Sequence, residues 1–153
     1  MLRRLIPLLL CLVAVALWIR FQAPPAAPVD PFKLTLRLDD PSSRLFYEFS
    51  ERDRGAEFRY ELLSDGQTFK GSGPIDPAAA AKFRDELRLH QVWKLRGHSD
   101  AKQLGSLSVS EGERSHTVGI TIFDSEFVSW MFQKDSLPFQ SMKKALDKQK
   151  KGP

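Results

Sequence analysis

The segment from Phe32 to Leu38 alternates apolar and polar residues without interruption. Successive side chains of a β-strand point to opposite faces, so a period of two predicts a strand with one face on a core and the other in water. The same alternation recurs in Leu45–Ser50 and in Phe58–Leu62. A chain in which this pattern repeats is expected to form an antiparallel sheet that buries one of its faces.

Short turn sequences separate these strands. The residues from Asp39 to Ser43 have turn composition, and Asp65-Gly66 predicts a tight hairpin because glycine adopts positive φ at little cost. The return strand is expected to cover Gln67 to Lys70. The sequence Gly71-Ser72-Gly73-Pro74 then predicts a turn rather than a phosphate-binding loop, because no lysine–serine or lysine–threonine pair follows it.

A helix is predicted next, because Asp76 is a good N-cap and Pro77 suits the first helical position. Its apolar face is expected to hold Ala80, Phe83, Leu87 and His90. Its polar face is expected to hold Lys82, Arg84, Asp85, Glu86 and Arg88. A second helix is predicted from Ser136-Leu137-Pro138 to about Lys148, with an apolar stripe of Phe139, Met142 and Leu146.

Three more strands are predicted between the helices, at Leu104–Ser110, His116–Phe123 and Phe127–Phe132. On the second of these, Val118, Ile120 and Ile122 are expected to face inward. The predicted fold is therefore α+β. It consists of antiparallel β meanders of about six or seven strands, with two amphipathic helices packed on one face, and a membrane-inserting helix precedes it.

The predicted domains follow from these elements. Residues 1–21 form a signal-anchor or signal peptide, residues 22–31 a proline- and alanine-rich linker, residues 32–149 a single globular domain, and residues 150–153 the end of a basic tail. About 120 residues is a common size for one domain with one core. Cys11 is the only cysteine and lies in the first segment, so the domain is expected to be stable without disulfides.

The first segment has the composition of an export signal. Arg3 and Arg4 precede fifteen uncharged residues, Leu5–Ile19, and Arg20 ends the run. Fifteen residues of helix rise only about 22 Å, so both a cleaved signal and an uncleaved anchor fit. Trp18 and Arg20 favour an anchor, because tryptophan prefers the membrane interface and arginine reaches toward it.

The domain is exported whether the first segment is a cleaved signal or an uncleaved anchor. The favoured location is the inner membrane, crossed once, with the domain on the periplasmic or extracytoplasmic side; the alternative is a secreted or periplasmic protein cleaved near Ala16. Four prolines between Gln22 and Pro31 predict an extended spacer of up to about 30 Å. Such a stalk favours the anchor, because it is useful only to a domain that stays attached.

The formal net charge of +4 comes from the two ends of the chain. Between Phe21 and Met142 the chain carries a net charge of −3, so a basic nucleic-acid-binding face is not expected. The lysines near the carboxyl end favour a solvated, frayed helix terminus; the alternative is electrostatic contact with anionic lipid headgroups or an acidic envelope protein. They are Lys143, Lys144, Lys148, Lys150 and Lys151.

Residues typical of catalysis are present, but their spacing does not predict a site. The histidines His90, His98 and His116 are not spaced as a metal pair, and His90 is expected in the core or at a helix end. His98, Ser99 and Asp100 resemble a hydrolase set in composition only, because near neighbours on one loop diverge. We therefore predict no catalytic residue, metal or cofactor.

From Phe58 to Leu95 the chain combines an aromatic strand, the Asp65-Gly66 hairpin, an aspartate-capped helix and a Val-Trp-x-Leu exit. In this it resembles bacterial exported domains of unknown function that share this order of elements. The resemblance covers about a quarter of the chain. It implies an envelope location and no particular activity, and it carries no site residue to this sequence.

The function predicted from these features is that of a membrane-tethered, non-enzymatic binding or assembly module of the bacterial envelope. Two alternatives remain open: a small envelope hydrolase or enzyme accessory that uses loop residues near His98 and Asp100, and a purely structural spacer. The oligomeric state is not predicted.

Overall fold

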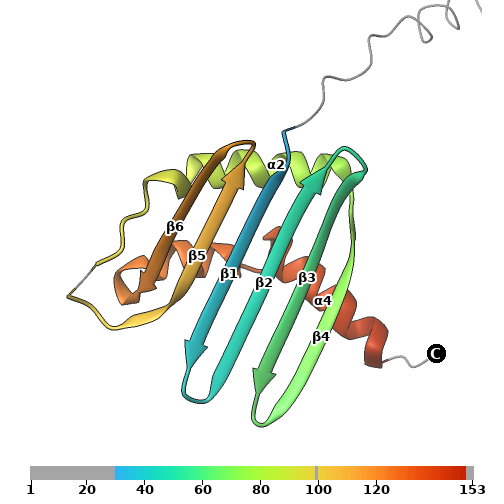
Figure 1. The fold of residues 1–153 in the computed structure, drawn as a ribbon. Helices are drawn as coiled ribbons and strands as arrows, with labels where there is room; N and C mark the ends of the chain where they lie inside the picture. The colour runs from blue at the N-terminus through green and yellow to red at the C-terminus, as the bar shows by residue number, and fades with distance from the viewer. Residues whose placement is uncertain (1–29, 99, 151–153) are drawn as a thin grey trace, which may run out of the picture.

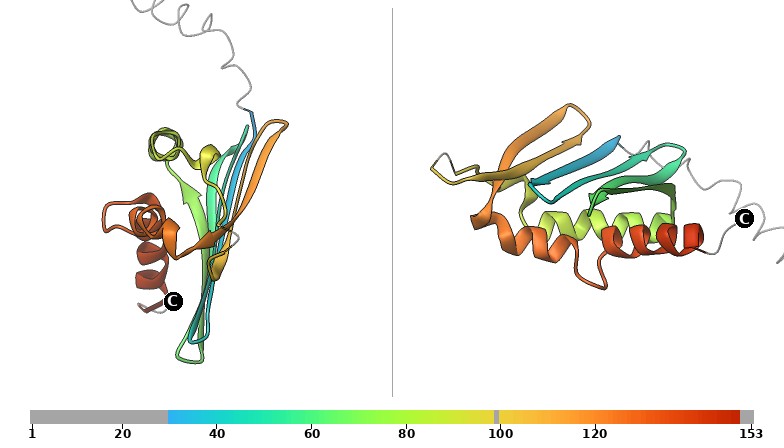
Figure 2. Two further views of the ribbon diagram at one scale, coloured as in Figure 1. Left: turned by 90° about the vertical axis from the view of Figure 1, so that its left-hand side faces the viewer. Right: turned by 90° about the horizontal axis from the view of Figure 1, so that it is seen from below.

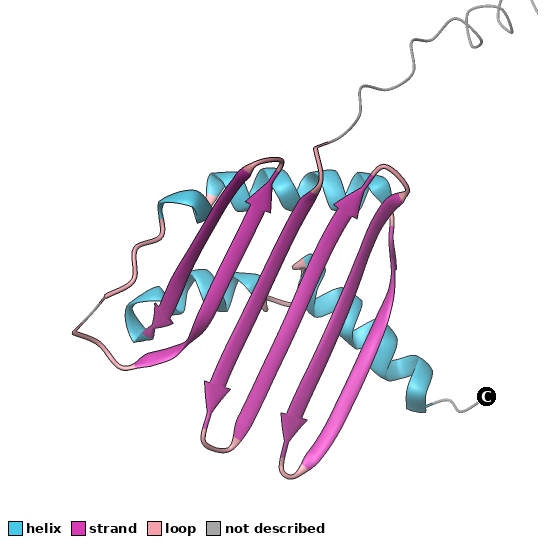
Figure 3. Cartoon of the chain, viewed as in Figure 1, coloured by secondary structure: helices cyan, strands magenta, loops and turns pink. Residues whose placement is uncertain are grey.

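The computed structural model describes residues 30–98 and 100–150. Within them, six strands form one antiparallel sheet in the order β4-β3-β2-β1-β5-β6 (Figures 1 and 3). The strands are β1 (Phe32–Asp40), β2 (Ser43–Arg52), β3 (Gly55–Ser64), β4 (Gln67–Ile75), β5 (Gln103–Glu111) and β6 (Arg114–Thr121). The first predicted strand, β1, therefore lies inside the sheet, between β2 and β5.

In the described part of the chain, three α-helices pack on the same face of this sheet (Figure 2). The helical elements are α2 (Pro77–Leu89), η2 (Val92–Lys94), η3 (Ile122–Asp124), α3 (Ser125–Met131) and α4 (Leu137–Lys150). The α+β class and the antiparallel sheet with helices on one face are thus as predicted. No helix in the described part of the chain has the length and apolar composition needed to span a bilayer.

The strand register brings the inward-facing residues of neighbouring strands together. Leu36 pairs with Tyr47 on one side and with Leu107 on the other, and all three are fully buried. The next inward row contains Leu34, Phe49 and Val109. Alternation along each strand therefore produces one continuous apolar face, which α2 covers with the predicted residues Ala80, Phe83 and Leu87.

His90 does not lie in the core. It is the C-cap residue of α2, is exposed, and stacks on Trp130 with ring centroids 3.9 Å apart. Of the two positions predicted for His90, the core and the helix end, the structure shows the helix end.

The sequence Gly71-Ser72-Gly73-Pro74 is a strand, so the prediction of a turn was wrong. Gly71 pairs with Tyr60 and Gly73 with Phe58. A Cβ atom on Gly71 would lie 2.4 Å from Cε1 of Tyr60 and 2.9 Å from Cβ of Ala145. The glycine is thus required for close approach between α4 and the sheet, not for a turn.

The segment predicted as a seventh strand, Phe127–Phe132, lies mostly in helix α3. Phe127 and Met131 are buried at helical spacing, whereas the alternate residues of a strand would have pointed to opposite faces. Strand β6 also ends earlier than predicted, at Thr121. Ile122 consequently lies in the η3 turn with 63% of its surface exposed, so its predicted inward orientation was wrong.

Arg84 was predicted to face water, but its side chain is only 15% exposed. Its guanidinium bonds to Glu51 at the end of β2 (3.2 Å) and to Glu111 at the end of β5 (2.6 Å). It also lies over the Phe32 ring, 5.3 Å from the centroid. Arg84 therefore holds α2 against the end of the sheet at which β1 begins.

Helix α4 begins at Leu137, as the sequence predicts. The Ser136 hydroxyl accepts a hydrogen bond from the Phe139 amide (3.3 Å) and donates one to the Met131 carbonyl (2.6 Å). Met142 and Leu146 pack on the core together with Ala145, whereas Phe139 is half-buried outside that cluster. The core-facing stripe of α4 is therefore rotated relative to the predicted one.

Candidate functional site: a lysine-lined cleft beside helix α4

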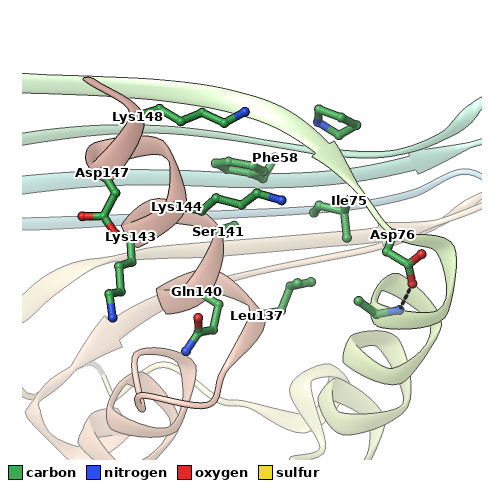
Figure 4. Close-up of a pocket in the computed structure, with 12 residues that line it drawn as sticks. Phe58, Ile75, Asp76, Leu137, Gln140, Ser141, Lys143, Lys144, Asp147 and Lys148 are labelled. Atoms are coloured by element: carbon green, nitrogen blue, oxygen red, sulfur yellow. Dashed lines mark hydrogen bonds between the residues drawn. The ribbon is translucent and has the colours of Figure 1, made fainter. Parts of the chain in front are cut away.

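A cleft of about 490 Å³ lies between α4, the end of β4 and the start of α2 (Figure 4). Helix α4 contributes three cations to it, Lys143, Lys144 and Lys148. Its other lining residues are Phe58, Pro74, Ile75, Asp76, Ala79, Leu137, Gln140, Ser141 and Asp147. Volumes of this order are typical of sites for small molecules or single chemical groups.

Packing on the opposite side of α4 fixes the direction of these lysines. Ser141 and Ala145, one turn apart, lie against the sheet, and Gly71 provides the space that Ala145 needs. Because 3.6 residues make a helical turn, Lys144 and Lys148 are then neighbours on one side face of the helix. The rotation of α4 is thus set by the core and determines where the charges lie.

Lys144 and Lys148 extend toward the side of the cleft formed by Phe58 and Ile75, while Lys143 and Asp147 extend away from it (Figure 4). All three lysines are exposed. Within residues 30–98 and 100–150, no carboxylate oxygen lies within 4.0 Å of their Nζ atoms. The cleft thus presents positive charge that no carboxylate in this part of the chain pairs.

Apolar side chains form much of the cleft wall. Phe58 and Ile75 are each more than nine-tenths buried and show only an edge to the cleft, and Leu137 adds a third apolar group. A second hollow of about 290 Å³, along Gly71–Pro74, shares Lys144 and Lys148 with the first. The site therefore combines two cations with adjoining apolar surface, which suits an anion that carries an apolar group.

The start of helix α2 forms the far wall. Asp76 accepts hydrogen bonds from the amides of Ala78 (3.0 Å) and Ala79 (3.2 Å), so its carboxylate already satisfies the free N–H groups of the helix. The positive end of α2 is thereby neutralised. In this cleft the attraction for an anion comes from the lysines of α4.

Ser141 lies three residues before Lys144, a spacing that occurs in some serine hydrolases. Its hydroxyl donates to the Pro138 carbonyl (2.9 Å), so the hydroxyl of Tyr47, 3.4 Å away, donates to Ser141 in turn. Burial raises the pKa of Tyr47, which keeps it protonated. This chain of bonds fixes α4 to β2.

None of the three histidines of the sequence lines the lysine cleft. His98 is exposed and packs against Phe123, with ring centroids 5.1 Å apart. His116 bonds through Nε2 to the Leu95 carbonyl (3.0 Å). No group of three or more potential metal ligands occurs in the described residues. The hydrolase hypothesis based on His98 and Asp100 stays a prediction.

The structure brings together three of the five predicted lysines. The side chain of Lys150, Lys151, and the predicted anchor residues Arg3, Arg4, Trp18 and Arg20 lie outside the described part of the chain. The apolar wall was missed, because Phe58 and Ile75 read as ordinary core residues in the sequence. The sequence feature that could have pointed to this cleft is the Gly-Ser-Gly-Pro segment, because its small residues leave room beside α4.

Comparisons with protein-family models, curated proteins and solved structures found no match to this chain.

Proposed function

We propose that this chain is a membrane-tethered, non-enzymatic binding module on the outer side of a bacterial inner membrane, and that its lysine cleft binds anionic lipid headgroups. The observation that carries the proposal is the pair Lys144 and Lys148, which extend over apolar surface and have no carboxylate partner among the described residues. Lysines are common ligands for phosphate groups and act as point charges.

The size of the cleft favours a headgroup over an acidic protein. Residues four apart on a helix rise about 6 Å, so both ammonium groups can contact one phosphate-sized anion. A specific protein interface, in contrast, needs about 800 Å² on each partner, much more than one small cleft supplies. The apolar wall around Phe58 and Ile75 suits the glycerol and first methylene groups of a lipid.

The amino-terminal sequence supports a location near a bilayer. Arg3 and Arg4, the apolar run, and Trp18 and Arg20 have the order of a signal-anchor. The linker of residues 22–31 spans at most about 30 Å, so a domain on this tether stays close to the membrane surface. Anionic headgroups are therefore abundant ligands at the place where the domain is expected.

The test uses the full chain in nanodiscs of zwitterionic lipid, titrated with a soluble short-chain phosphatidylglycerol. We expect saturable binding that weakens with salt, because exposed charges are screened over about 10 Å at 0.1 M ionic strength. The double substitution Lys144→Gln/Lys148→Gln is expected to weaken binding about thirtyfold, since each lysine contributes roughly 1 kcal/mol to headgroup attraction.

The matched control is Lys94→Gln/Lys102→Gln, which removes the same charge from exposed positions outside the cleft. We expect this control to bind within about twofold of the unchanged chain. Equal weakening by both double substitutions would show that only net charge matters, and would overturn the proposal. Equal binding of short-chain phosphatidylcholine would overturn it as well.

A further inference from the structure

A third hollow, of about 360 Å³, lies beside the same edge strand as the lysine cleft. We call it the arginine hollow, because Arg52 and Arg54, around the turn between β2 and β3, supply its cations. Glu57 also lines it and points to the sheet face without helices, since its neighbour Phe58 points to the helix side. The arginine hollow therefore lies across β4 from the lysine cleft.

The two arginines have no carboxylate partner in the described part of the chain. No carboxylate oxygen of these residues lies within 4.0 Å of their guanidinium nitrogens, and both side chains are exposed. Asp53, between them in sequence, does not line the hollow. Glu57 does line it, and accepts a hydrogen bond from the Ser50 hydroxyl (3.3 Å). The hollow thus presents two positive groups against one negative group.

A short edge of β4 separates the two groups of cations. Pro74 lines the lysine cleft and both smaller hollows, and Ser72 lines the two smaller ones. Ser64 and Gln67 form a hydrogen-bonded pair, because only two residues, both with positive φ, separate them. Since such pairs alternate along an antiparallel ladder, the Ser72 amide points away from β3, out of the sheet edge. A backbone donor therefore lies between the lysines and the arginines.

Both sites lie at the end of the sheet at which the linker joins it (Figure 1). One row of paired residues crosses the sheet there, formed by Phe32, Glu51, Ala56 and Ile75. Phe32 begins β1, Arg52 follows Glu51, and Ile75 lines the lysine cleft. A domain tethered at this end by a linker of at most about 30 Å keeps both groups of cations within reach of lipid headgroups.

We propose that the lysine cleft and the arginine hollow together bind one lipid whose two phosphate groups are joined by a short bridge, as in diphosphatidylglycerol. One phosphate contacts Lys144 and Lys148, and the other contacts Arg52 and Arg54. The bridge crosses the edge of β4 at Ser72, whose amide donates to a phosphate oxygen. Arginine suits this role, because its guanidinium group donates two parallel hydrogen bonds to one phosphate.

Two separate phosphates are needed because the strand lies between the two groups of cations. A single phosphate reaches only one group, and two phosphates that share an oxygen atom are held too close together to reach both faces of a strand. This inference rests on the proposed function, since it names the class of headgroup that the lysine cleft binds.

The test uses the full chain in nanodiscs of zwitterionic lipid, titrated separately with short-chain diphosphatidylglycerol and short-chain phosphatidylglycerol. We expect Arg52→Gln/Arg54→Gln to weaken binding of diphosphatidylglycerol about thirtyfold and to leave binding of phosphatidylglycerol within about twofold. Because both arginines are exposed, this variant is expected to keep its thermal unfolding temperature.

The matched control is Arg44→Gln/Arg96→Gln, which removes the same charge from exposed positions outside both sites. We expect it to change the binding of either lipid by no more than about twofold. A third titration uses geranyl diphosphate, whose two phosphates share an oxygen atom. We expect Arg52→Gln/Arg54→Gln to leave its binding unchanged. A loss for geranyl diphosphate without a loss for diphosphatidylglycerol would overturn the bridged geometry.

The outcomes separate this inference from the proposed function. Binding of neither phospholipid would overturn both. If phosphatidylglycerol binds through Lys144 and Lys148 but Arg52→Gln/Arg54→Gln leaves diphosphatidylglycerol binding intact, only the two-phosphate inference fails. It also fails if this variant weakens both lipids equally, or if the control variant weakens diphosphatidylglycerol as much.

Discussion

Gly71 is the residue on which the position of helix α4 most directly depends. It pairs with Tyr60 across β3 and β4 and lies directly under Ala145. Any side chain at this point must displace either a buried ring or the helix. Because α4 carries Lys144 and Lys148, Gly71 also determines where these two lysines lie in the cleft.

We expect Gly71→Ala to lower the free energy of unfolding by about 1–3 kcal/mol, because the added methyl group overpacks a well-filled contact. Thermal unfolding followed by circular dichroism measures this. At Gly66, in contrast, a Cβ would meet no atom within 4 Å. Any loss of stability in Gly66→Ala would therefore come from the strained positive φ of +74° and not from packing. An unchanged melting temperature for Gly71→Ala would show that α4 does not pack as described.

Asp76 gives a second residue-scale prediction, because it both caps α2 and lines the lysine cleft. Asp76→Asn keeps an N-cap of similar quality but removes a negative charge. We expect it to preserve stability and to strengthen binding of short-chain phosphatidylglycerol about two- to fivefold, as for an exposed charge worth ~0.3–1 kcal/mol. Weaker binding by this variant would contradict a site that attracts anions.

At the scale of elements, α2 is fastened to the sheet by a shared charge cluster. Glu111 accepts hydrogen bonds from Arg84 (2.6 Å) and Arg88 (2.9 Å), which come from successive turns of the helix. Burial alone would raise the pKa of Glu111, but its bonds to the two arginines outweigh burial and hold the pKa below its ordinary value. The ionised form is therefore favoured by the fold.

A group whose pKa is lowered by folding stabilises the protein above its unfolded pKa and loses this effect as pH falls through the folded value. We therefore expect the contribution of Glu111 to be complete at neutral pH and to decline as the pH falls below the ordinary glutamate pKa of about 4.3 and through the lower pKa of the folded state. Glu111→Gln is expected to cost about 1–3 kcal/mol at pH 7 and less at pH 3. Urea unfolding at both pH values measures the difference; a cost independent of pH would contradict the charge argument.

The elements differ in how far the sequence predicted them. Strands β1 to β3 and helices α2 and α4 were predicted, because alternation and capping are local signals that the tertiary structure reinforces. Helix α3 was missed, because its bulky residues also suit a strand and its seven residues are too few to establish a period. The Gly-rich end of β4 was missed because its glycines serve packing against α4, which is not a local property.

The candidate site was predictable only in part. The lysines of the carboxyl-terminal cluster are adjacent in sequence, so their common location was evident from charge alone. The rotation of α4 over the sheet determines that Lys144 and Lys148 face Phe58 and Ile75. This rotation is set by Gly71, Ser141 and Tyr47, which come from three different elements. No pattern within one segment encodes such a convergence.

At the scale of the whole molecule, the amino terminus is expected to stay on the mature protein as an anchor. Mass spectrometry of the chain purified from membranes is expected to find the residues from Arg3 to Arg20 present. The chain is also expected to remain in the membrane pellet after extraction at alkaline pH, because an apolar helix is held by the bilayer rather than by charge. A mature amino terminus that begins just after Ala16 would contradict the anchor.

The central claim, that the lysine cleft meets anionic lipid, is tested most directly by photo-cross-linking in native membranes. A photoreactive amino acid is placed at Gln140, an exposed residue of the cleft wall, and in a second variant at Thr117, which is exposed on β6. We predict that Gln140 gains the mass of an anionic phospholipid and that Thr117 does not. Lipid adducts of equal yield at both positions, or only protein adducts at Gln140, would contradict the account.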